Sequence, residues 1–420
     1  MRLLYCPRFL EVRLQMRKLA ILSLHTSPLA QPGSGDGGGM NVYVREVSLA
    51  LSQAGVSSTV FTRRTNSKSP TVVEVEPGFE VVQVEAGDFD LPKEQLFSVV
   101  ENFKEGVEKF LENDPQYDAL LANYWLSGIA AHKLKHSLNL PLLTIFHTLA
   151  RIKAAAGDQD FELDRRIKAE QEIIGCSDVI LSNDSHELSQ MVHHYGADPS
   201  RIEVISPGVD HSIFKTGSKK EARKSIGIDG SPMMLFVGRI QPLKGVDIAV
   251  QTLAALDNKN SQLVIVGGSS GLDGPEEEKY VRCLANELGL GSRVKFIPPQ
   301  PHEVLADWYR AADVVVMPSR SESFGLVALE AAACGVPVVA ASVGGLRTIV
   351  SHGVSGYLVR ERNPFAYASY ISRIINDPKK ALVMSKAASE RSSSFTWLAT
   401  AARLRRVYSD VLSRALVDCS

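Results

Sequence analysis

Two cationic side chains lie close together near the middle of the chain, Arg239 and Lys244. An apolar run before them, Met233–Val237, predicts a strand, and Gly245 after them marks the expected start of a helix. The loop between these elements would present both cations. Cations and the free N–H groups of a helix start both bind diphosphates. Arg239 and Lys244 are therefore candidate catalytic groups that would stabilise a departing diphosphate.

Two carboxylates follow later in the chain, Glu322 and Glu330. Glu322 is expected in a loop, a helix is expected to start at Phe324-Gly325-Leu326, and Glu330 would lie about one to two turns into it. Because carboxylate oxygens accept hydrogen bonds from hydroxyl groups, we expect Glu330 to hold a ribose. Glu322, a third catalytic candidate, would contact the donor sugar or the face beside the diphosphate. The cations and carboxylates together predict a nucleotide-sugar site.

The two patterns resemble the R-x4-K and E-x7-E motifs of the retaining GT-B glycosyltransferases. More selective strings in the N-terminal half resemble the D-inositol-3-phosphate glycosyltransferases of mycothiol synthesis. They are His25-Thr26-Ser27-Pro28, Gln31-Pro32-Gly33, Gly38-Gly39-Met40-Asn41-Val42-Tyr43, Tyr124-Trp125-Leu126-Ser127-Gly128 and His147-Thr148-Leu149-Ala150.

This resemblance runs from Lys18 to about Tyr408. It implies an α/β protein of the GT-B fold, in which two doubly wound, Rossmann-like parallel-sheet domains face a cleft. It also implies an activity, the transfer of N-acetylglucosamine from UDP to inositol phosphate with the anomeric configuration retained. The partners would be a UDP-sugar donor and a phosphorylated polyol acceptor.

The resemblance further implies ligand residues. The acceptor phosphate would be bound by two cations and two neutral donors, Lys93, Arg166, Tyr124 and Thr148, which is a coherent set for a small dianion. Arg166 could instead serve an i,i+4 ion pair with Glu170. Loop-end residues would reach the inositol hydroxyls, and these are His25 and Asn41. The other acceptor-binding positions are Asp36, Gly37, Gly38, Gly39 and Met40. The other donor-binding positions are Gln31, Pro32, Gly39, Gln300, Phe324, Gly325 and Leu326.

Three positions depart from the family pattern. Asn123 stands where histidine is common, and Gln300 replaces a frequent arginine near the nucleotide base. Arg151 stands where a small residue or lysine is usual. Arg151 bears most on the acceptor, because it would set a bulky cation close to the expected pocket.

Strands and helices alternate along the chain, which predicts parallel sheets. Strands are expected at Lys18–His25, Ser58–Phe61, Val81–Val84, Ala119–Ala122, Leu142–Phe146, Val179–Leu181 and Ile202–Ile205, then at Met233–Val237, Gln262–Val266, Val294–Ile297, Val314–Met317 and Val336–Ala340. A helix is expected at Met40–Ser52, and the end, Pro364–Cys419, is expected to be helical. We predict an acceptor-binding domain at 18–215, a nucleotide-sugar-binding domain at 216–395 and a final helix at 396–420, with 1–17 as an extension. The return of that helix to the first domain is implied by the resemblance.

Composition excludes several classes of protein. The net charge of −1 arises from 46 basic and 47 acidic residues, so no global field attracts nucleic acid. No apolar run approaches the roughly 20 residues of a membrane span. The five cysteines are scattered and lack C-x-x-C spacing, so neither a disulfide framework nor a zinc site is expected, and a reducing cytoplasm is the expected location. The inferred chemistry requires no cofactor, although Mg²⁺ is compatible with it. The sequence is compatible with a homodimer without fixing the oligomeric state.

Local patterns offer three competing interpretations. The glycine-rich loop Gly33–Asn41 contains G-x-G-x-x-G, but it starts well beyond the first strand, and the second strand ends in Thr62-Arg63-Arg64 rather than in an acidic residue. A loop that approaches a bound sugar or phosphate therefore fits better than an NAD(P) site. Asp88-Phe89-Asp90 could hold a metal ion, but no supporting ligands are visible nearby. His132 and His136 have the spacing of a zinc pair, but Lys133 and Lys135 favour a solvated basic helix face.

Other functions stay open on the same scaffold. Glu322 and Glu330 could suggest a glycosidase, but Arg239 and Lys244 favour transfer from a diphosphate. A non-catalytic sensor would not need both cations. An epimerase acting on UDP-N-acetylglucosamine would need no acceptor. Enzymes like sucrose-phosphate synthase, which transfer glucose from UDP to a sugar phosphate, are the main rival.

Overall fold

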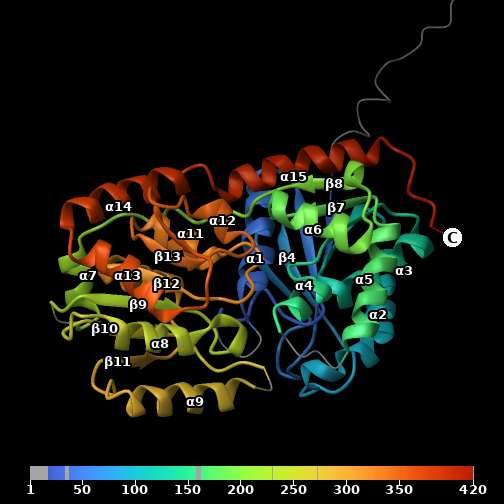
Figure 1. The fold of residues 1–420 in the computed structure, drawn as a ribbon. Coiled ribbons are helices and arrows are strands. Elements are labelled where there is room, and N and C mark those ends of the chain that lie inside the picture. The colour runs from blue at the N-terminus through green and yellow to red at the C-terminus, as the bar shows by residue number, and fades with distance from the viewer. Residues whose placement is uncertain (1–17, 34–36, 158–161, 229, 272, 420) are drawn as a thin grey trace, which may run out of the picture.

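The computed structural model describes residues 18–33, 37–157, 162–228, 230–271 and 273–419, which form two α/β domains side by side (Figure 1). The predicted extension at 1–17 and the candidate residue Asp36 lie outside the described residues. Each domain has its own sheet and its own core on both faces of that sheet.

The first domain holds an eight-stranded sheet in the order β3-β4-β2-β1-β5-β6-β7-β8. Its strands are β1 (Lys18–Leu22), β2 (Ser57–Arg63), β3 (Val72–Glu76), β4 (Phe79–Val84), β5 (Tyr117–Asn123), β6 (Leu142–Ile145), β7 (Val179–Ser182) and β8 (Ile202–Val204). All neighbours pair in parallel except β3, which pairs antiparallel with β4. The central strands are apolar almost throughout, because helices cover both faces of a parallel sheet.

The helices of the first domain divide between the two faces. On one face α1 (Gly39–Gln53) packs on the sheet. On the other face lie α2 (Val100–Glu112), α3 (Tyr124–Leu138), α5 (Leu163–Cys176) and α6 (Ser185–Tyr195). Shorter elements are the 3₁₀ helices η3 (Lys93–Val99) and η4 (Pro199–Arg201) and the helix α4 (Ala150–Ala155).

The second domain holds a six-stranded parallel sheet in the order β11-β10-β9-β12-β13-β14. Its strands are β9 (Met233–Val237), β10 (Gln262–Val266), β11 (Val294–Ile297), β12 (Val314–Met317), β13 (Val338–Ala341) and β14 (Gly356–Val359). One face is covered by α8 (Val246–Ala255), α9 (Gly274–Glu287) and α13 (Pro364–Ile375). The other face is covered by α7 (Lys219–Ser225), α10 (His302–Ala311), α11 (Leu326–Ala333) and α12 (Leu346–Ile349). Two doubly wound domains confirm the predicted fold class.

The predicted strand positions are right for β9, β10, β11 and β12. Two strands, β3 and β14, were not predicted. β3 is a half-exposed edge strand whose valines alternate with glutamates, and β14 is a short strand that begins with a glycine. Both lack the long apolar run that marks a buried parallel strand.

The chain ends with α14 (Pro378–Ser392) on the second domain and α15 (Trp397–Leu412), which lies over the first domain (Figure 1). Trp397, Leu404 and Tyr408 of α15 are buried with Val44 and Val47 of α1. The prediction of helix to Cys419 is wrong at its end, because residues 413–419 continue beyond α15 as a non-helical tail.

That tail overturns the prediction that the cysteines form no disulfide. Cys419 reaches the end of α5, where the structure joins it to Cys176, 243 residues earlier in the chain. Cys283 and Cys334 are free. Of the helices in the described ranges, none has the length and apolar character that crossing a bilayer requires.

Candidate active site

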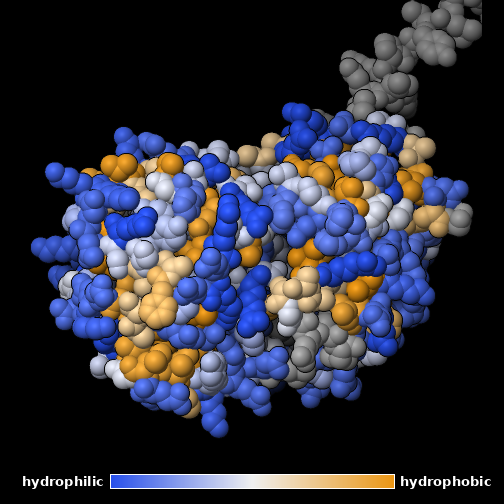
Figure 2. Space-filling view, viewed as in Figure 1, coloured by the Kyte–Doolittle hydropathy of each residue, from blue (hydrophilic) through white to orange (hydrophobic). Residues whose placement is uncertain are grey.

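A cavity of about 340 Å³ lies between the two domains, where loops from the carboxyl ends of both sheets face each other. Figure 2 shows hydrophilic side chains along the line where the domains meet. Ligands of open α/β sheets bind at this edge, because the loops after parallel strands converge there.

The loop after β9 contributes both cations of the R-x4-K pattern. Arg239 follows the strand, and Lys244 ends the 3₁₀ turn η5 (Pro242–Lys244) directly before α8. Gly245 has φ of 70°, and a Cβ there would lie 2.3 Å from the carbonyl oxygen of Pro318, so only glycine fits this turn. The turn therefore directs Lys244 towards the cavity.

Arg239 also lies next to the glycine-rich loop of the first domain. A Cβ built on Gly38 would lie 3.5 Å from Arg239 Nε, an ordinary contact distance, so the two domains meet here. Gly38, Gly39 and Met40 all line the cavity. The loop thus contacts the same space as the cation, as expected for a loop that approaches a ligand.

Both glutamates of the E-x7-E pattern line the same cavity. Lys244 Nζ donates to Glu322 Oε2 at 2.6 Å, which joins the two patterns by an ion pair. Gly325 has φ of 97° and precedes α11, and the residues at this helix start, Phe324, Gly325 and Leu326, line the cavity. Free backbone N–H groups at such a start favour a bound anion.

Glu330 lies one turn into α11 and is buried, although it belongs to the cavity lining. The Tyr309 hydroxyl donates to Glu330 Oε2 at 2.7 Å. Burial raises the pKa of the Glu330 carboxyl to about 7, and the hydrogen bond from Tyr309 partly opposes that rise. A buried carboxyl in the cavity lining can bind a neutral hydroxyl group.

The first domain contributes Lys93, Tyr124 and Thr148 to the lining. Lys93 begins η3, and Tyr124 begins α3 with φ of 74°, an uncommon left-handed conformation for a tyrosine. The rings of Tyr124 and His25 are in contact, with centroids 4.5 Å apart. Burial, reinforced by the charge of Lys93, lowers the pKa of His25 well below its ordinary value. A neutral imidazole therefore faces the cavity.

Arg166 lies behind these residues rather than in the cavity lining. Its side chain is 1% exposed, and its Nε donates to Glu170 Oε1 at 2.8 Å. Its Nη2 donates to the Thr148 carbonyl oxygen at 2.7 Å and to Thr148 Oγ1 at 3.0 Å. Its guanidinium also lies over the Tyr124 ring. The i,i+4 pair is thus present, and Arg166 positions two lining residues.

Asn41 lines the cavity, but its amide holds the glycine-rich loop. Nδ2 donates to Thr26 Oγ1 and to the Ser27 carbonyl oxygen, while Oδ1 accepts from the Gly38 N–H at 2.9 Å. Gly37 lies outside the lining, where its carbonyl accepts from the Gly33 N–H.

Of the other predicted donor-binding residues, Pro32 and Gln300 belong to the lining. Gln300 Nε2 donates to the Pro298 carbonyl oxygen at 2.8 Å. Gln31 is exposed at the rim and lies outside the lining.

The structure also places the departures from the family pattern. Asn123 is fully buried, and its Oδ1 lies 2.9 Å from His147 Nε2, so it orients that imidazole. Arg151 turns away from the cavity, with its guanidinium 5.5 Å from the Tyr195 ring centroid. The bulky cation therefore lies outside the cavity lining.

Sequence reasoning missed several lining residues, among them His147 and Lys153. His147 has φ of 58°, burial lowers its pKa to about 3, and its carbonyl oxygen accepts from Ser323 Oγ of the second domain. Lys153 lies on α4, which follows the His147 loop. The sequence could have indicated His147, because its loop follows the predicted strand β6 and therefore lies at the same sheet edge as Tyr124.

The acidic loop Asp88-Phe89-Asp90 lies away from the cavity lining. The carbonyl oxygen of Asp88 accepts from Arg63 Nη1 at 2.6 Å. This hydrogen bond holds the loop against Arg63, the last residue of β2.

Charge in the cavity is predominantly positive. Its described lining contains four cationic side chains and two carboxylates. The cations are Lys93, Lys153, Arg239 and Lys244, and the carboxylates are Glu322 and Glu330. Glu322 is already paired with Lys244, and the raised pKa of Glu330 reduces its negative charge near neutral pH. The arrangement can bind two anionic groups, one on each side of the cavity.

Comparisons with known proteins agree with this geometry. Residues 37–213 match the family model described as Glycosyltransferase Family 4, and residues 218–391 match that described as Glycosyl transferases group 1. Among solved structures, a sucrose-phosphate synthase from Thermosynechococcus elongatus superposes with a TM-score of 0.88 at 32% identity and covers 95% of this chain and 100% of its own. Anabaena HepE, solved in complex with UDP-glucose, superposes with a TM-score of 0.75 at 21% identity over 94% of this chain and 99% of its own, which shows the fold alone.

Relatives of similar length are more alike in sequence. A D-inositol 3-phosphate glycosyltransferase from Thermobispora bispora is 41% identical over 96% of both chains. One from Frankia alni is 43% identical over 94% of this chain and 100% of its own. With this identity over nearly the whole length, the chain belongs to the D-inositol 3-phosphate glycosyltransferase family, within the GT-B glycosyltransferases.

Proposed function

We propose that this protein transfers N-acetylglucosamine from UDP-N-acetylglucosamine to 1D-myo-inositol 3-phosphate with retention, a step of mycothiol biosynthesis. The observation that carries the proposal is the placement of cations on both sides of one cavity. Arg239 and Lys244 of the second domain suit a diphosphate, while Lys93 of the first domain suits a separate phosphate. The family name of the relatives supports the same acceptor.

The donor half stabilises the leaving group. As the bond between the anomeric carbon and the diphosphate oxygen breaks, negative charge grows on UDP and the sugar becomes oxocarbenium-like. Arg239, Lys244 and the N–H groups at the start of α11 stabilise that charge in a site walled from water by two domains. These groups make Mg²⁺ unnecessary in the proposal, so turnover is expected without added divalent ion.

The remaining lining groups orient the two sugars. Glu330 accepts a hydrogen bond from a ribose hydroxyl, and Glu322 contacts the donor sugar once the diphosphate has bound Lys244. Lys93, Tyr124 and Thr148 bind the acceptor phosphate. Neutral His25 accepts a hydrogen bond from an inositol hydroxyl.

Retention is part of the proposal. The acceptor hydroxyl attacks the face that the diphosphate leaves, its oxygen bonds to the anomeric carbon, and its proton passes to the departing phosphate oxygen. This front-face route uses no covalent intermediate with the protein. The NMR coupling constant of the product's anomeric proton tests it, because inversion would give the opposite anomer.

One observation favours a second candidate. The sucrose-phosphate synthase superposes closely and is 32% identical over almost the whole chain. A UDP-glucose transferase acting on a sugar phosphate would use the same division of cations between the domains. The two candidates differ in donor sugar and in the shape of the acceptor, not in the leaving group.

A matrix of purified enzyme against donors and acceptors separates these functions. UDP-N-acetylglucosamine and UDP-glucose are each combined with inositol 3-phosphate, inositol and fructose 6-phosphate, and released UDP is measured. The proposal expects the highest kcat/KM for UDP-N-acetylglucosamine with inositol 3-phosphate. Preference for UDP-glucose with fructose 6-phosphate would establish the second candidate. UDP released equally with and without any acceptor would point to an epimerase or hydrolase.

A further inference from the structure

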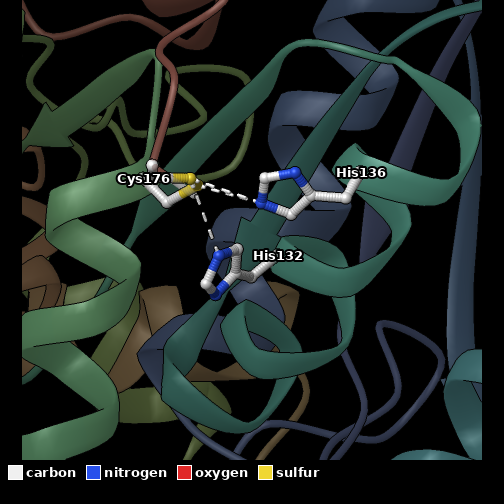
Figure 3. Close-up of side chains that lie close together, drawn as sticks. His132, His136 and Cys176 are labelled. Atoms are coloured by element: carbon white, nitrogen blue, oxygen red, sulfur yellow. Dashed lines mark hydrogen bonds between the residues drawn. A yellow bond between two sulfur atoms is a disulfide. The ribbon is translucent and has the colours of Figure 1, made fainter.

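Four metal-ligating side chains meet in the first domain at the ends of α3 and α5. Figure 3 labels three of them, His132, His136 and Cys176. His132 and His136 lie one turn apart on α3, Cys176 is the last residue of α5, and Cys419 comes from the tail after α15. Their ligand atoms all lie within 4.8 Å of one another. The cluster combines three segments that are distant in sequence.

The nitrogen–sulfur distances fit one tetrahedral ion, and the two sulfurs, which are joined in the disulfide, must separate to bind it. His136 Nε2 lies 3.4 Å from Cys176 Sγ and 3.3 Å from Cys419 Sγ, and His132 Nε2 lies 3.8 Å from Cys419 Sγ. Zinc bonds of about 2.3 Å to sulfur and about 2.0 Å to nitrogen place such ligands roughly 3.5 Å apart. Both histidines direct the same nitrogen, Nε2, towards the sulfurs.

The lysines that argued against this site are neutralised elsewhere. Lys135 is buried, and its Nζ donates to the Cys176 carbonyl oxygen at 2.8 Å and to Asp178 Oδ1 at 2.9 Å. Lys133 pairs with Glu101 on the neighbouring helix. Neither ammonium group therefore opposes a cation at the four ligand atoms.

The same neighbourhood holds the tail in place. The N–H of Val417 donates to Asp178 Oδ1 at 2.6 Å, which sets the tail two residues before Cys419. Neutral imidazoles with two thiolates form an S₂N₂ set, which is typical of zinc.

We propose that His132, His136, Cys176 and Cys419 bind one Zn²⁺ ion when the two cysteines are reduced. Binding releases the two thiol protons and joins two thiolates and two imidazoles to the ion. The disulfide and the zinc site exclude each other, since both use the same sulfurs. Conversion of the disulfide takes two electrons from a dithiol reductant, which is itself oxidised to a disulfide with loss of two protons.

The site's role is to fasten the chain end to the first domain. α3 and α5 begin near the cavity, at Tyr124 and close to Arg166, and their opposite ends carry His136 and Cys176. The ion would join these far ends to the tail. Because only the folded chain gathers the ligands, zinc stabilises it without taking part in transfer.

Metal content of the full-length chain tests the proposal. The protein is purified under a thiol reductant, dialysed without chelator, and its zinc and free thiols are counted in the same sample. About one Zn²⁺ per chain is expected. Replacement by Co²⁺ should give the charge-transfer absorption of thiolate ligands. Cys419→Ser and His136→Gln should each weaken Zn²⁺ binding by at least about 100-fold, and zinc should raise the wild-type Tm.

Matched variants separate this site from adventitious binding. Cys283→Ser removes an exposed free cysteine, and His193→Gln alters one of two adjacent histidines on α6. Both should keep full zinc content. Glycosyl transfer by each variant reports that the chain is folded. Reduced wild-type protein with free thiols but no zinc would overturn the proposal, as would zinc content unchanged by Cys419→Ser and His136→Gln.

Discussion

Lys244 and Glu322 form an ion pair within the cavity, with Lys244 Nζ 2.6 Å from Glu322 Oε2. The two residues come from the separate loops after β9 and β12. A diphosphate that binds Lys244 competes with Glu322 for the same ammonium group. The ion pair therefore couples donor binding to the position of the glutamate that is proposed to contact the donor sugar.

Lys244→Ala should lower kcat by about 10²–10³, because it removes a group that stabilises charge in the transition state. It also leaves Glu322 unpaired beside the diphosphate site, so affinity for UDP should fall. The double variant Lys244→Ala/Glu322→Gln should recover UDP affinity without recovering kcat. Calorimetric titration of UDP and steady-state rates give both quantities. Near-normal turnover in Lys244→Ala would refute the leaving-group role.

Glu330→Gln should raise the KM for the UDP-sugar and leave the KM for inositol 3-phosphate unchanged. Glu330 lines the second domain's part of the cavity, where the ribose is proposed to lie. Initial rates with each substrate varied in turn separate the two constants. A large rise in the KM for inositol 3-phosphate with an unchanged KM for the UDP-sugar would show that Glu330 acts on the acceptor instead.

The same variant should change how stability depends on pH. The pKa of Glu330 is about 7 in the folded chain and about 4.3 when unfolded. Between these values the folded state holds a proton that the unfolded state has lost, so this group lowers stability as pH rises. Wild type should lose this stability between pH 5 and pH 8, whereas Glu330→Gln should not. The unfolding free energy of the variant minus that of wild type should therefore rise by about 1–3 kcal/mol over this range. Urea unfolding at both pH values measures the gain, and a difference that does not change with pH contradicts it.

Arg166→Ala should destabilise the fold by about 3–5 kcal/mol, because it leaves the buried Glu170 without its cation. Arg166→Met/Glu170→Gln should recover much of that loss, since the remaining donors to residue 170, the Ala150 N–H and Tyr195 hydroxyl, are neutral. Urea denaturation measures both variants. Wild-type stability in Arg166→Ala would show that the ion pair contributes little.

Local patterns were sufficient to predict that Arg239, Lys244 and Glu322 lie together. Arg239 and Lys244 lie in a loop directly after a buried strand, and the loop positions follow from the strand alone. Parallel topology then brings Glu322 to the same sheet edge. The alternation of strands and helices predicted the parallel sheets, and the family resemblance implied the two-domain fold.

Side chains that depend on tertiary neighbours could not be placed. Arg166 matches a phosphate-binding position in sequence, yet its guanidinium is directed by Glu170 and Thr148. Arg151 points away from the cavity because its guanidinium lies over the Tyr195 ring. The Cys176–Cys419 contact required the path of the tail after α15, which no local spacing records.

The central claim is that the first domain binds a phosphorylated acceptor, and Lys93→Ala tests it most directly. kcat/KM is measured with inositol 3-phosphate and with inositol, in wild type, in Lys93→Ala and in the control Arg151→Ala, whose guanidinium points away from the cavity. We predict that Lys93→Ala loses about 10–100-fold on the phosphorylated acceptor, the worth of a hydrogen bond to a charged group. Inositol, a poor acceptor throughout, should be almost unaffected, and Arg151→Ala should change neither. Equal losses on both acceptors in Lys93→Ala would contradict phosphate recognition by this cavity.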